Sequence, residues 1–146
     1  MSDFRTLSDR VLASPQIAVD DIAAARDCGV SMVINNRPDG EADDQTSGAA
    51  IEAAARAAGL DYAAIPITPG NFTEAEVRAM ADALNRAEGK VLAYCRTGTR
   101  STLLWALAQA AMGTPVDEVA AAADAAGYDI TPVRPAMAVL AARAQA

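Results

Sequence analysis

Short apolar runs alternate with polar, turn-forming stretches along most of the chain. The apolar runs predict strands at residues 11–13, 30–34, 62–67 and 91–94. Helix-capping residues and alanine-rich stretches predict helices at residues 22–27, 49–58, 73 to about 88, 101–112, from about 117 to Gly127, and roughly 134–142. Helices between successive strands act as crossovers. The pattern therefore predicts an α/β fold, with a mostly parallel sheet of four or five strands flanked by helices.

The order of the strands predicts where the chemistry lies. The run at residues 11–13 stops at Ser14-Pro15, which predicts an edge strand. In parallel sheets, ligands bind beyond the carboxyl ends of the strands. Three predicted loops leave those ends, at residues 35–48, 68–72 and 96–99, and we expect them to converge around Cys95.

Length and charge narrow the classes of function. A chain of 146 residues predicts a single domain spanning residues 1–146. The formal charge of −7 argues against nucleic acid or an anionic membrane surface as a partner. No apolar run is long enough to span a membrane, and the first ten residues lack the apolar core of a signal peptide, so we expect a cytoplasmic protein. In that reducing compartment Cys28 and Cys95 should both be free thiols.

The stretch KVLAYCRTGTRS, residues 90–101, predicts a buried strand, a tight loop and the start of a helix. Cys95 falls where the strand stops. The loop and the helix N-terminus should direct backbone N–H groups towards it, and these groups favour a thiolate. A buried, inert cysteine on a core strand is the alternative. The glycine and the two flanking arginines favour the reactive interpretation.

The chain contains no histidine. This absence excludes a Ser-His-Asp triad, a Cys-His dyad and the usual zinc sites, and we predict neither a metal nor a cofactor. Any chemistry at Cys95 must be activated by the loop, the helix dipole and the arginines.

Several residues near Cys95 are candidates for binding a small anion. Arg96 and Arg100 would hold it, unless one of them instead braces the loop through main-chain carbonyls. Gly98 allows a positive φ where the loop turns hardest. The remaining candidates in this stretch are hydroxyl groups, those of Thr97, Thr99 and Ser101.

Two charged residues and the second cysteine allow more than one interpretation. Arg37 is equally consistent with an anion ligand and with a salt bridge to Asp39 or Glu41. We expect Glu41 to lie in solvent rather than to orient Arg37. Cys28, at a predicted helix end, is expected to be an ordinary semi-buried residue rather than a resolving thiol.

The spacing around Cys95 resembles the active loops of two enzyme families. Cysteine-dependent phosphatases place His-Cys-x5-Arg-Ser/Thr between a strand and a helix. Rhodanese-type sulfurtransferases use a loop that is one residue shorter, often YCRxGxRS. Here Tyr94 precedes Cys95, and four residues separate Cys95 from Arg100, so the loop resembles the rhodanese kind.

A wider resemblance rests on FRTLSDRVLASPQI, INNRPDGE, the IPI strand, YCRTGTRS and AAGYD. Together these segments resemble the bacterial phosphatase-like domain family of β-lactamase-hydrolase-like proteins. The resemblance implies a phosphatase-like fold with a rhodanese-like loop, and a role in sulfur transfer. Members occur alone or fused to a persulfide dioxygenase, which suggests such an enzyme, or a thiol-carrier protein, as a partner.

Two physical arguments favour sulfur over phosphate. A shorter loop encloses less space, which suits a sulfane sulfur better than a phosphoryl group. The predicted loop at residues 68–72 also lacks a carboxylate that could protonate a phosphatase leaving group, whereas transfer between thiols needs no acid. Carboxylates that could still reach in from another loop are Asp39, Glu41, Asp43 and Asp44.

The sequence thus predicts a sulfurtransferase that acts through a Cys95 persulfide. The donor would be thiosulfate, glutathione persulfide or a polysulfide, and the acceptor a thiol or cyanide. One alternative is a cysteine-dependent phosphatase acting on phosphotyrosine or a small phosphoester. Another is a non-catalytic persulfide carrier or anion-binding module.

Overall fold

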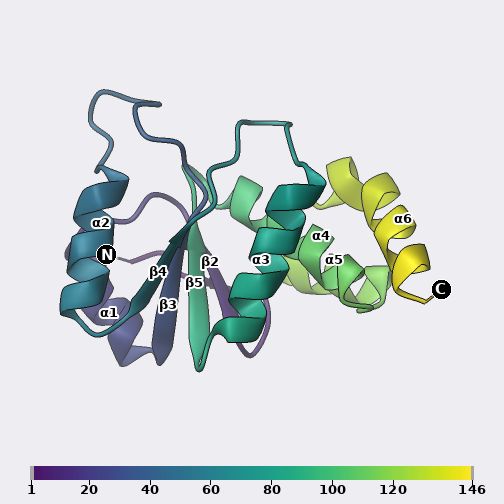
Figure 1. Cartoon of the computed structure of the whole chain (residues 1–146), viewed down its shortest axis with the longest axis horizontal. Helices are drawn as coiled ribbons and strands as arrows, with labels where there is room; N and C mark the ends of the chain where they lie inside the picture. The colour runs from purple at the N-terminus through teal and green to yellow at the C-terminus, as the bar shows by residue number, and fades with distance from the viewer. Residues whose placement is uncertain (1, 146) are drawn as a thin grey trace.

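The computed structural model describes residues 2–145, which form a five-stranded sheet with helices packed on both faces (Figure 1). The strands are β1 (Arg5–Thr6), β2 (Val11–Ser14), β3 (Val30–Asn35), β4 (Asp61–Ala64) and β5 (Lys90–Tyr94). They lie in the order β1-β2-β5-β3-β4, and only β1 and β2 pair antiparallel. The predicted α/β fold with a mostly parallel sheet is therefore confirmed.

Helices cover the two faces of the sheet. They are α1 (Asp21–Asp27), α2 (Gly48–Ala57), α3 (Glu74–Arg86), α4 (Thr99–Ala111), α5 (Val116–Ala125), the 3-10 helix η1 (Thr131–Val133) and α6 (Arg134–Ala144). α1 and α2 cover one face, while α3 and α4 cover the other with α5 and α6 packed beyond α4 (Figure 1). Each face of the sheet therefore has its own apolar core.

The central strand β5 contributes to both cores. Val91 and Ala93 pack in the core that contains α3 and α4, whereas Leu92 and Tyr94 pack in the core that contains α1 and α2. This alternation follows from the two-residue period of a strand. Because β5 is buried on both faces, the residue that follows it, Cys95, leaves the sheet from a rigid position.

Helix α4 is packed on most of its surface. Leu104, Ala106 and Ala108 are completely buried, and Trp105 lies in the core as expected. A helix held in this way fixes the loop that precedes its first turn. None of the helices within residues 2–145 combines the length and the apolar character needed to span a bilayer.

Two details of the sheet differ from the sequence prediction. β2 is not an edge strand, because β1 pairs with it, with Arg5 opposite Ala13. A two-residue strand is too short to leave a recognisable pattern. The strand predicted at residues 62–67 ends at Ala64, near Pro66, which has no N–H for a ladder. Ile65 still donates a backbone hydrogen bond to Asn35, at 2.9 Å.

Candidate active site

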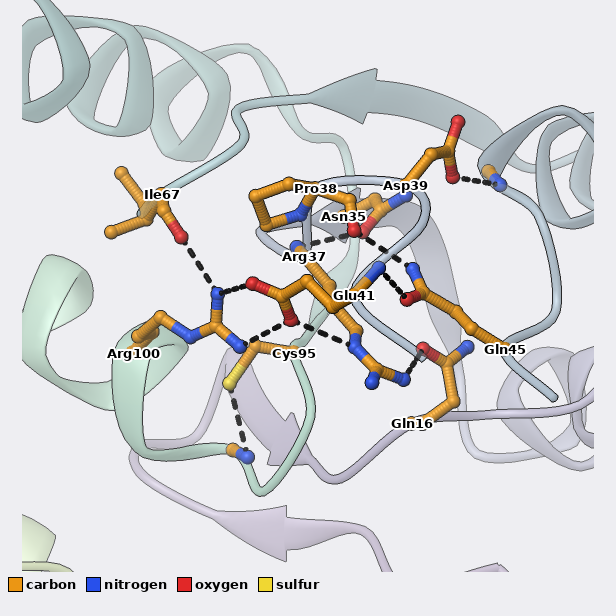
Figure 2. Close-up of polar contacts among 12 residues, drawn as sticks. Gln16, Asn35, Arg37, Pro38, Asp39, Glu41, Gln45, Ile67, Cys95 and Arg100 are labelled. Atoms are coloured by element: carbon orange, nitrogen blue, oxygen red, sulfur yellow. Dashed lines mark hydrogen bonds and ion pairs between the residues drawn. The ribbon is translucent and has the colours of Figure 1, made fainter. Parts of the chain in front are cut away.

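Cys95 lies at the carboxyl end of β5 and is completely buried. The Gly98 N–H donates a hydrogen bond to the Cys95 Sγ atom, with 3.1 Å between nitrogen and sulfur (Figure 2). α4 begins at Thr99 rather than at the predicted residue 101, so the loop is only three residues long before the helix starts. An N–H group and a helix N-terminus beside the sulfur both stabilise a thiolate.

Gly98 is required by both its backbone and its surroundings. Its φ of 91° lies in the left-handed region, and a Cβ atom there would collide with the Tyr128 hydroxyl. That hydroxyl donates to the Thr97 carbonyl oxygen at 3.2 Å, and the Arg5 guanidinium lies 5.1 Å from the centre of the Tyr128 ring. The tight loop is therefore supported from behind by segments near both ends of the chain.

Arg100 is braced by three hydrogen bonds. Its Nη1 and Nη2 atoms each donate to one carboxylate oxygen of Glu41 at 2.8 Å, and Nη1 also donates to the Ile67 carbonyl oxygen at 2.7 Å. A guanidinium has five N–H donors, so the Nε–H and one Nη2–H remain. Figure 2 shows this remaining edge turned towards the Cys95 sulfur. Arg100 can therefore keep its brace while offering two parallel donors beside Cys95.

Glu41 connects two arginines, and the expectation that it lies in solvent is wrong. Besides Arg100, its carboxylate accepts a hydrogen bond from Arg37 Nε at 3.0 Å, and the Glu41 side chain is only 20% exposed. The hydrogen bonds from Arg100, and to a lesser degree the one from Arg37, lower the pKa of Glu41 to about 2. Its charge is thus held between the two guanidinium groups at neutral pH.

Arg37 is 5% exposed and forms a salt bridge with Glu41, not with Asp39. Its Nη1 atom also donates to Gln16 Oε1 at 3.0 Å. Of the two interpretations drawn from the sequence, the salt bridge is present, and a role for Arg37 as an anion ligand stays a prediction. Asp39 instead accepts a hydrogen bond from the Gly48 N–H at 2.8 Å, at the start of α2.

Ser101 is completely buried, and its hydroxyl donates to Asn36 Oδ1 at 2.8 Å. The Asn36 side chain in turn donates to the Ile65 carbonyl oxygen at 2.9 Å. Ser101 therefore ties the start of α4 to the ends of two strands, which is a bracing contact. Its predicted contact with a bound anion remains a prediction.

Arg96, Thr97 and Thr99 have exposed side chains. The two threonine hydroxyls hydrogen-bond to each other at 3.0 Å, and the Arg96 carbonyl oxygen accepts from the Gln16 N–H at 3.2 Å. Anion binding by these three side chains likewise stays a prediction.

The sequence interpretation missed Gln16, Asn36 and Tyr128 as parts of this site. Gln16 and Asn36 each follow a strand at the carboxyl edge of the sheet, and that position is the signal that could have found them. Tyr128 lies far along the chain, and its place behind Gly98 depends on the packing of α5 against α4.

Cys28 is exposed, rather than semi-buried as expected, and it caps the carboxyl end of α1 before β3 begins. It therefore lies at the amino ends of the parallel strands, whereas Cys95 lies at their carboxyl ends. Within residues 2–145, no group of three His, Cys, Asp or Glu side chains is arranged to hold a metal ion.

Comparison with known proteins places this site in a family. Residues 3–112 match the family model described as "Beta-lactamase hydrolase-like protein, phosphatase-like domain". A Beta-lactamase hydrolase-like protein of Xylella fastidiosa is 38% identical over 125 residues, which is 85% of this chain but only 29% of that protein. The chain thus spans less than a third of this curated relative.

Solved structures extend the comparison. A Neisseria meningitidis protein, described as a candidate phosphatase, is 33% identical with a TM-score of 0.83, over 96% of this chain and 99% of its own. TpbA of P. aeruginosa, solved in complex with pTyr, shares the fold at 19% identity, with a TM-score of 0.66 over 98% of this chain and 90% of its own.

The descriptions of the family and of the Neisseria meningitidis protein point to a phosphatase rather than to a sulfurtransferase. The rhodanese-like character of the loop stays a prediction from its spacing. The fold is that of the cysteine phosphatases, and the resemblance seen in the sequence is confirmed. The chain belongs to the family of the phosphatase-like domain of Beta-lactamase hydrolase-like proteins.

Proposed function

We propose that this domain transfers sulfane sulfur through a persulfide on Cys95. One observation supports this function above the others: the carboxylate that reaches Arg100 is Glu41, whose pKa of about 2 keeps it ionised at neutral pH. An ionised carboxylate cannot protonate the leaving group of a phosphoester. Sulfur transfer expels a thiolate or sulfite and requires no such donor.

In the proposed reaction, the Cys95 thiolate attacks the outer sulfur of a donor. A new S–S bond forms to Cys95, the S–S bond of the donor breaks, and the leaving group departs with the electron pair. The Gly98 N–H and the first turn of α4 stabilise the persulfide anion, and the remaining edge of Arg100 holds the donor. A thiol or cyanide then removes the sulfur and restores the Cys95 thiolate.

The space beside Cys95 supports a small transferred group. Only four residues separate Cys95 from Arg100, and Tyr128 packs behind the loop so that it cannot relax in that direction. A single sulfur atom needs less room than a phosphoryl group with three oxygens.

A cysteine-dependent phosphatase is the second candidate. The descriptions of the family and of the Neisseria meningitidis protein favour it. The two parallel donors of Arg100 beside Cys95 could also hold two oxygens of a phosphoryl group. This activity would need a proton donor other than Glu41.

The setting of the reaction is part of the proposal. A persulfide dioxygenase or a thiol-carrier protein would consume or deliver the sulfur, and a reducing cytoplasm would keep Cys95 free. If the protein binds sulfur without turnover, it is a carrier rather than an enzyme.

The test compares both activities in one preparation. We expect sulfur transfer from glutathione persulfide to cyanide, above the uncatalysed rate, and its loss in Cys95→Ser. Hydrolysis of a phosphotyrosine substrate should stay well below about 10⁴ M⁻¹s⁻¹ in kcat/KM, the low end for ordinary enzymes. A phosphatase rate at or above that value would reject sulfur transfer in favour of the second candidate. Sulfur loading without turnover would establish the carrier.

A further inference from the structure

We infer that Glu41 sets the charge of the sulfur donor, so that the site takes the hydropersulfide of a thiol in preference to the dianion thiosulfate. The inference rests on the proposed sulfur transfer and names the substrate class of the same site. It comes from the position of Glu41, which occupies one whole edge of the Arg100 guanidinium and also pairs with Arg37.

The charges fixed around Cys95 can be counted from these contacts. Arg37 and Arg100 contribute two positive charges, and Glu41, ionised between them, contributes one negative charge. These three side chains together therefore carry a single net positive charge. Arg96 has an exposed side chain, so solvent and salt screen its contribution.

The two donors place different charges in these surroundings. With thiosulfate, the Cys95 thiolate attacks the outer sulfur and sulfite leaves. The two reactants carry three negative charges, and the products, a Cys95 persulfide anion and the sulfite dianion, carry the same three. With a hydropersulfide, R–S–SH, the outer sulfur passes to Cys95 with its proton and R–S⁻ leaves. Here the reacting atoms carry one negative charge throughout, which matches the single net positive charge of Arg37, Arg100 and Glu41 together.

The N–H groups that remain on Arg100 favour the same sulfur donor, the hydropersulfide. Cys95 is completely buried, and the Arg100 guanidinium lies beside its sulfur (Figure 2). Three of the five Arg100 donors are taken by Glu41 and Ile67. The two that remain cannot satisfy the three oxygens of a sulfonate group, whereas a terminal S–H makes no such demand.

Charge and bracing at Glu41 can be separated by substitution. Glu41→Gln removes the charge but keeps one side-chain oxygen that can accept from Arg100. Glu41→Ala removes both the charge and the acceptor. Asp44→Asn is the matched control, because Asp44 lies in the same loop with an exposed side chain and loses the same charge.

The experiment measures how fast Cys95 gains one sulfur, by intact mass spectrometry, from glutathione persulfide and from thiosulfate. The wild-type protein should load faster from glutathione persulfide. Glu41→Gln should raise the thiosulfate rate about tenfold, the effect of one nearby unit charge in a partly solvated site, and change the persulfide rate less than about twofold. Asp44→Asn should leave both rates unchanged. An unchanged ratio of the two rates in Glu41→Gln, or the same gain in Asp44→Asn, would overturn the inference.

A second measurement does not depend on sulfur transfer. Sulfate, a stable dianion, should protect Cys95 from alkylation by iodoacetamide, and Glu41→Gln should lower the concentration for half-protection by about tenfold. If the wild-type protein loads from neither donor, the proposed function fails. The sulfate result still tests whether the charge of Glu41 weakens the binding of a dianion. If Glu41→Gln and Glu41→Ala both lose loading from the two donors equally and gain no sulfate protection, Glu41 is only a brace and the inference fails.

Discussion

Cys95 and Cys28 are both cysteines, but they lie at opposite ends of the parallel strands. Their burial, their hydrogen bonds and the helix end beside them all differ. Cys95 is completely buried, receives an N–H hydrogen bond at 3.1 Å and lies at the amino end of α4. Cys28 is exposed and lies at the carboxyl end of α1. From this difference we expect the loop and the helix, not the thiol itself, to decide which cysteine reacts.

A cavity also lies at the amino ends of the strands, away from Cys95. A cavity of about 480 Å³ opens at the edge where β2 and β5 begin, lined by residues that include Arg10, Val91 and Trp105. Cys95 and the pair formed by Arg100 and Glu41 lie at the other edge. The proposed site rests on the charged groups and the helix N-terminus, and a cavity of this size does not by itself locate it.

The strongest contrast is expected between substitutions of the two cysteines. Cys95→Ser should abolish sulfur loading from glutathione persulfide, because a serine hydroxyl is not ionised at neutral pH and this histidine-free chain has no general base of the usual kind. Cys28→Ser should leave turnover within about twofold of wild type, since no interaction that activates a thiol surrounds it in the structure. Loading that is lost in Cys28→Ser but kept in Cys95→Ser would mean that Cys28, not Cys95, carries the sulfur.

Arg100→Lys should reduce sulfur loading about 10- to 100-fold. Lysine keeps the charge but loses the planar fork that holds Glu41 and Ile67 while facing Cys95. Rates of loading with glutathione persulfide provide the measurement. Arg96→Lys serves as the comparison and should change the rate only slightly, because the Arg96 side chain is exposed. Loading by Arg100→Lys that is as fast as loading by Arg96→Lys would mean that charge alone, not the brace, is required.

Gly98→Ala should lower the free energy of unfolding by about 1–3 kcal/mol or more, because the positive φ strains any side chain and the new Cβ meets Tyr128. Gly113→Ala isolates the backbone contribution, since Gly113 has a φ of 94° and a Cβ atom added there would meet no other atom within 4 Å. Urea unfolding should rank Gly98→Ala below Gly113→Ala. Equal losses would show that Tyr128 does not support the loop.

The smallest expected effect is on acid stability. The folded pKa of Glu41, about 2, lies below its ordinary value near 4.5, so its contribution is complete above about pH 5 and is lost as the pH falls towards 2. Glu41→Gln should therefore flatten the decline in unfolding free energy over that range, measured by urea titration at several pH values. A slope in Glu41→Gln identical to wild type would contradict the salt bridges at this residue.

Local patterns predicted most of the fold. The capping box at Thr73 and Glu76 is present, with the Glu76 carboxylate accepting from the Thr73 N–H at 2.8 Å, and it starts α3 where expected. The apolar runs located the four parallel strands, and in β2, β3 and β5 burial on both faces of the sheet leaves this signal within a few residues. The cysteine and the loop after β5 were found for the same reason.

The contacts that shape the site could not be predicted in this way. Glu41 and Arg100 are 59 positions apart, and Tyr128 and Thr97 are 31 apart, so nothing in the neighbouring sequence announces either contact. An acidic residue in a polar loop suggests a solvated side chain unless its partner is known, here Arg100 in the first turn of α4. That is why the sequence interpretation placed Glu41 in solvent, and why it described the anion site without its internal carboxylate.

Sulfur transfer through Cys95 is tested most directly by the intact mass of the wild-type protein after mixing with glutathione persulfide, followed by peptide mapping. We expect a gain of one sulfur atom on the peptide that contains Cys95, and its removal by cyanide or a thiol. A protein that gains no sulfur on Cys95, but forms a phosphorylated Cys95 when mixed with a phosphotyrosine substrate, would contradict sulfur transfer and establish a phosphatase.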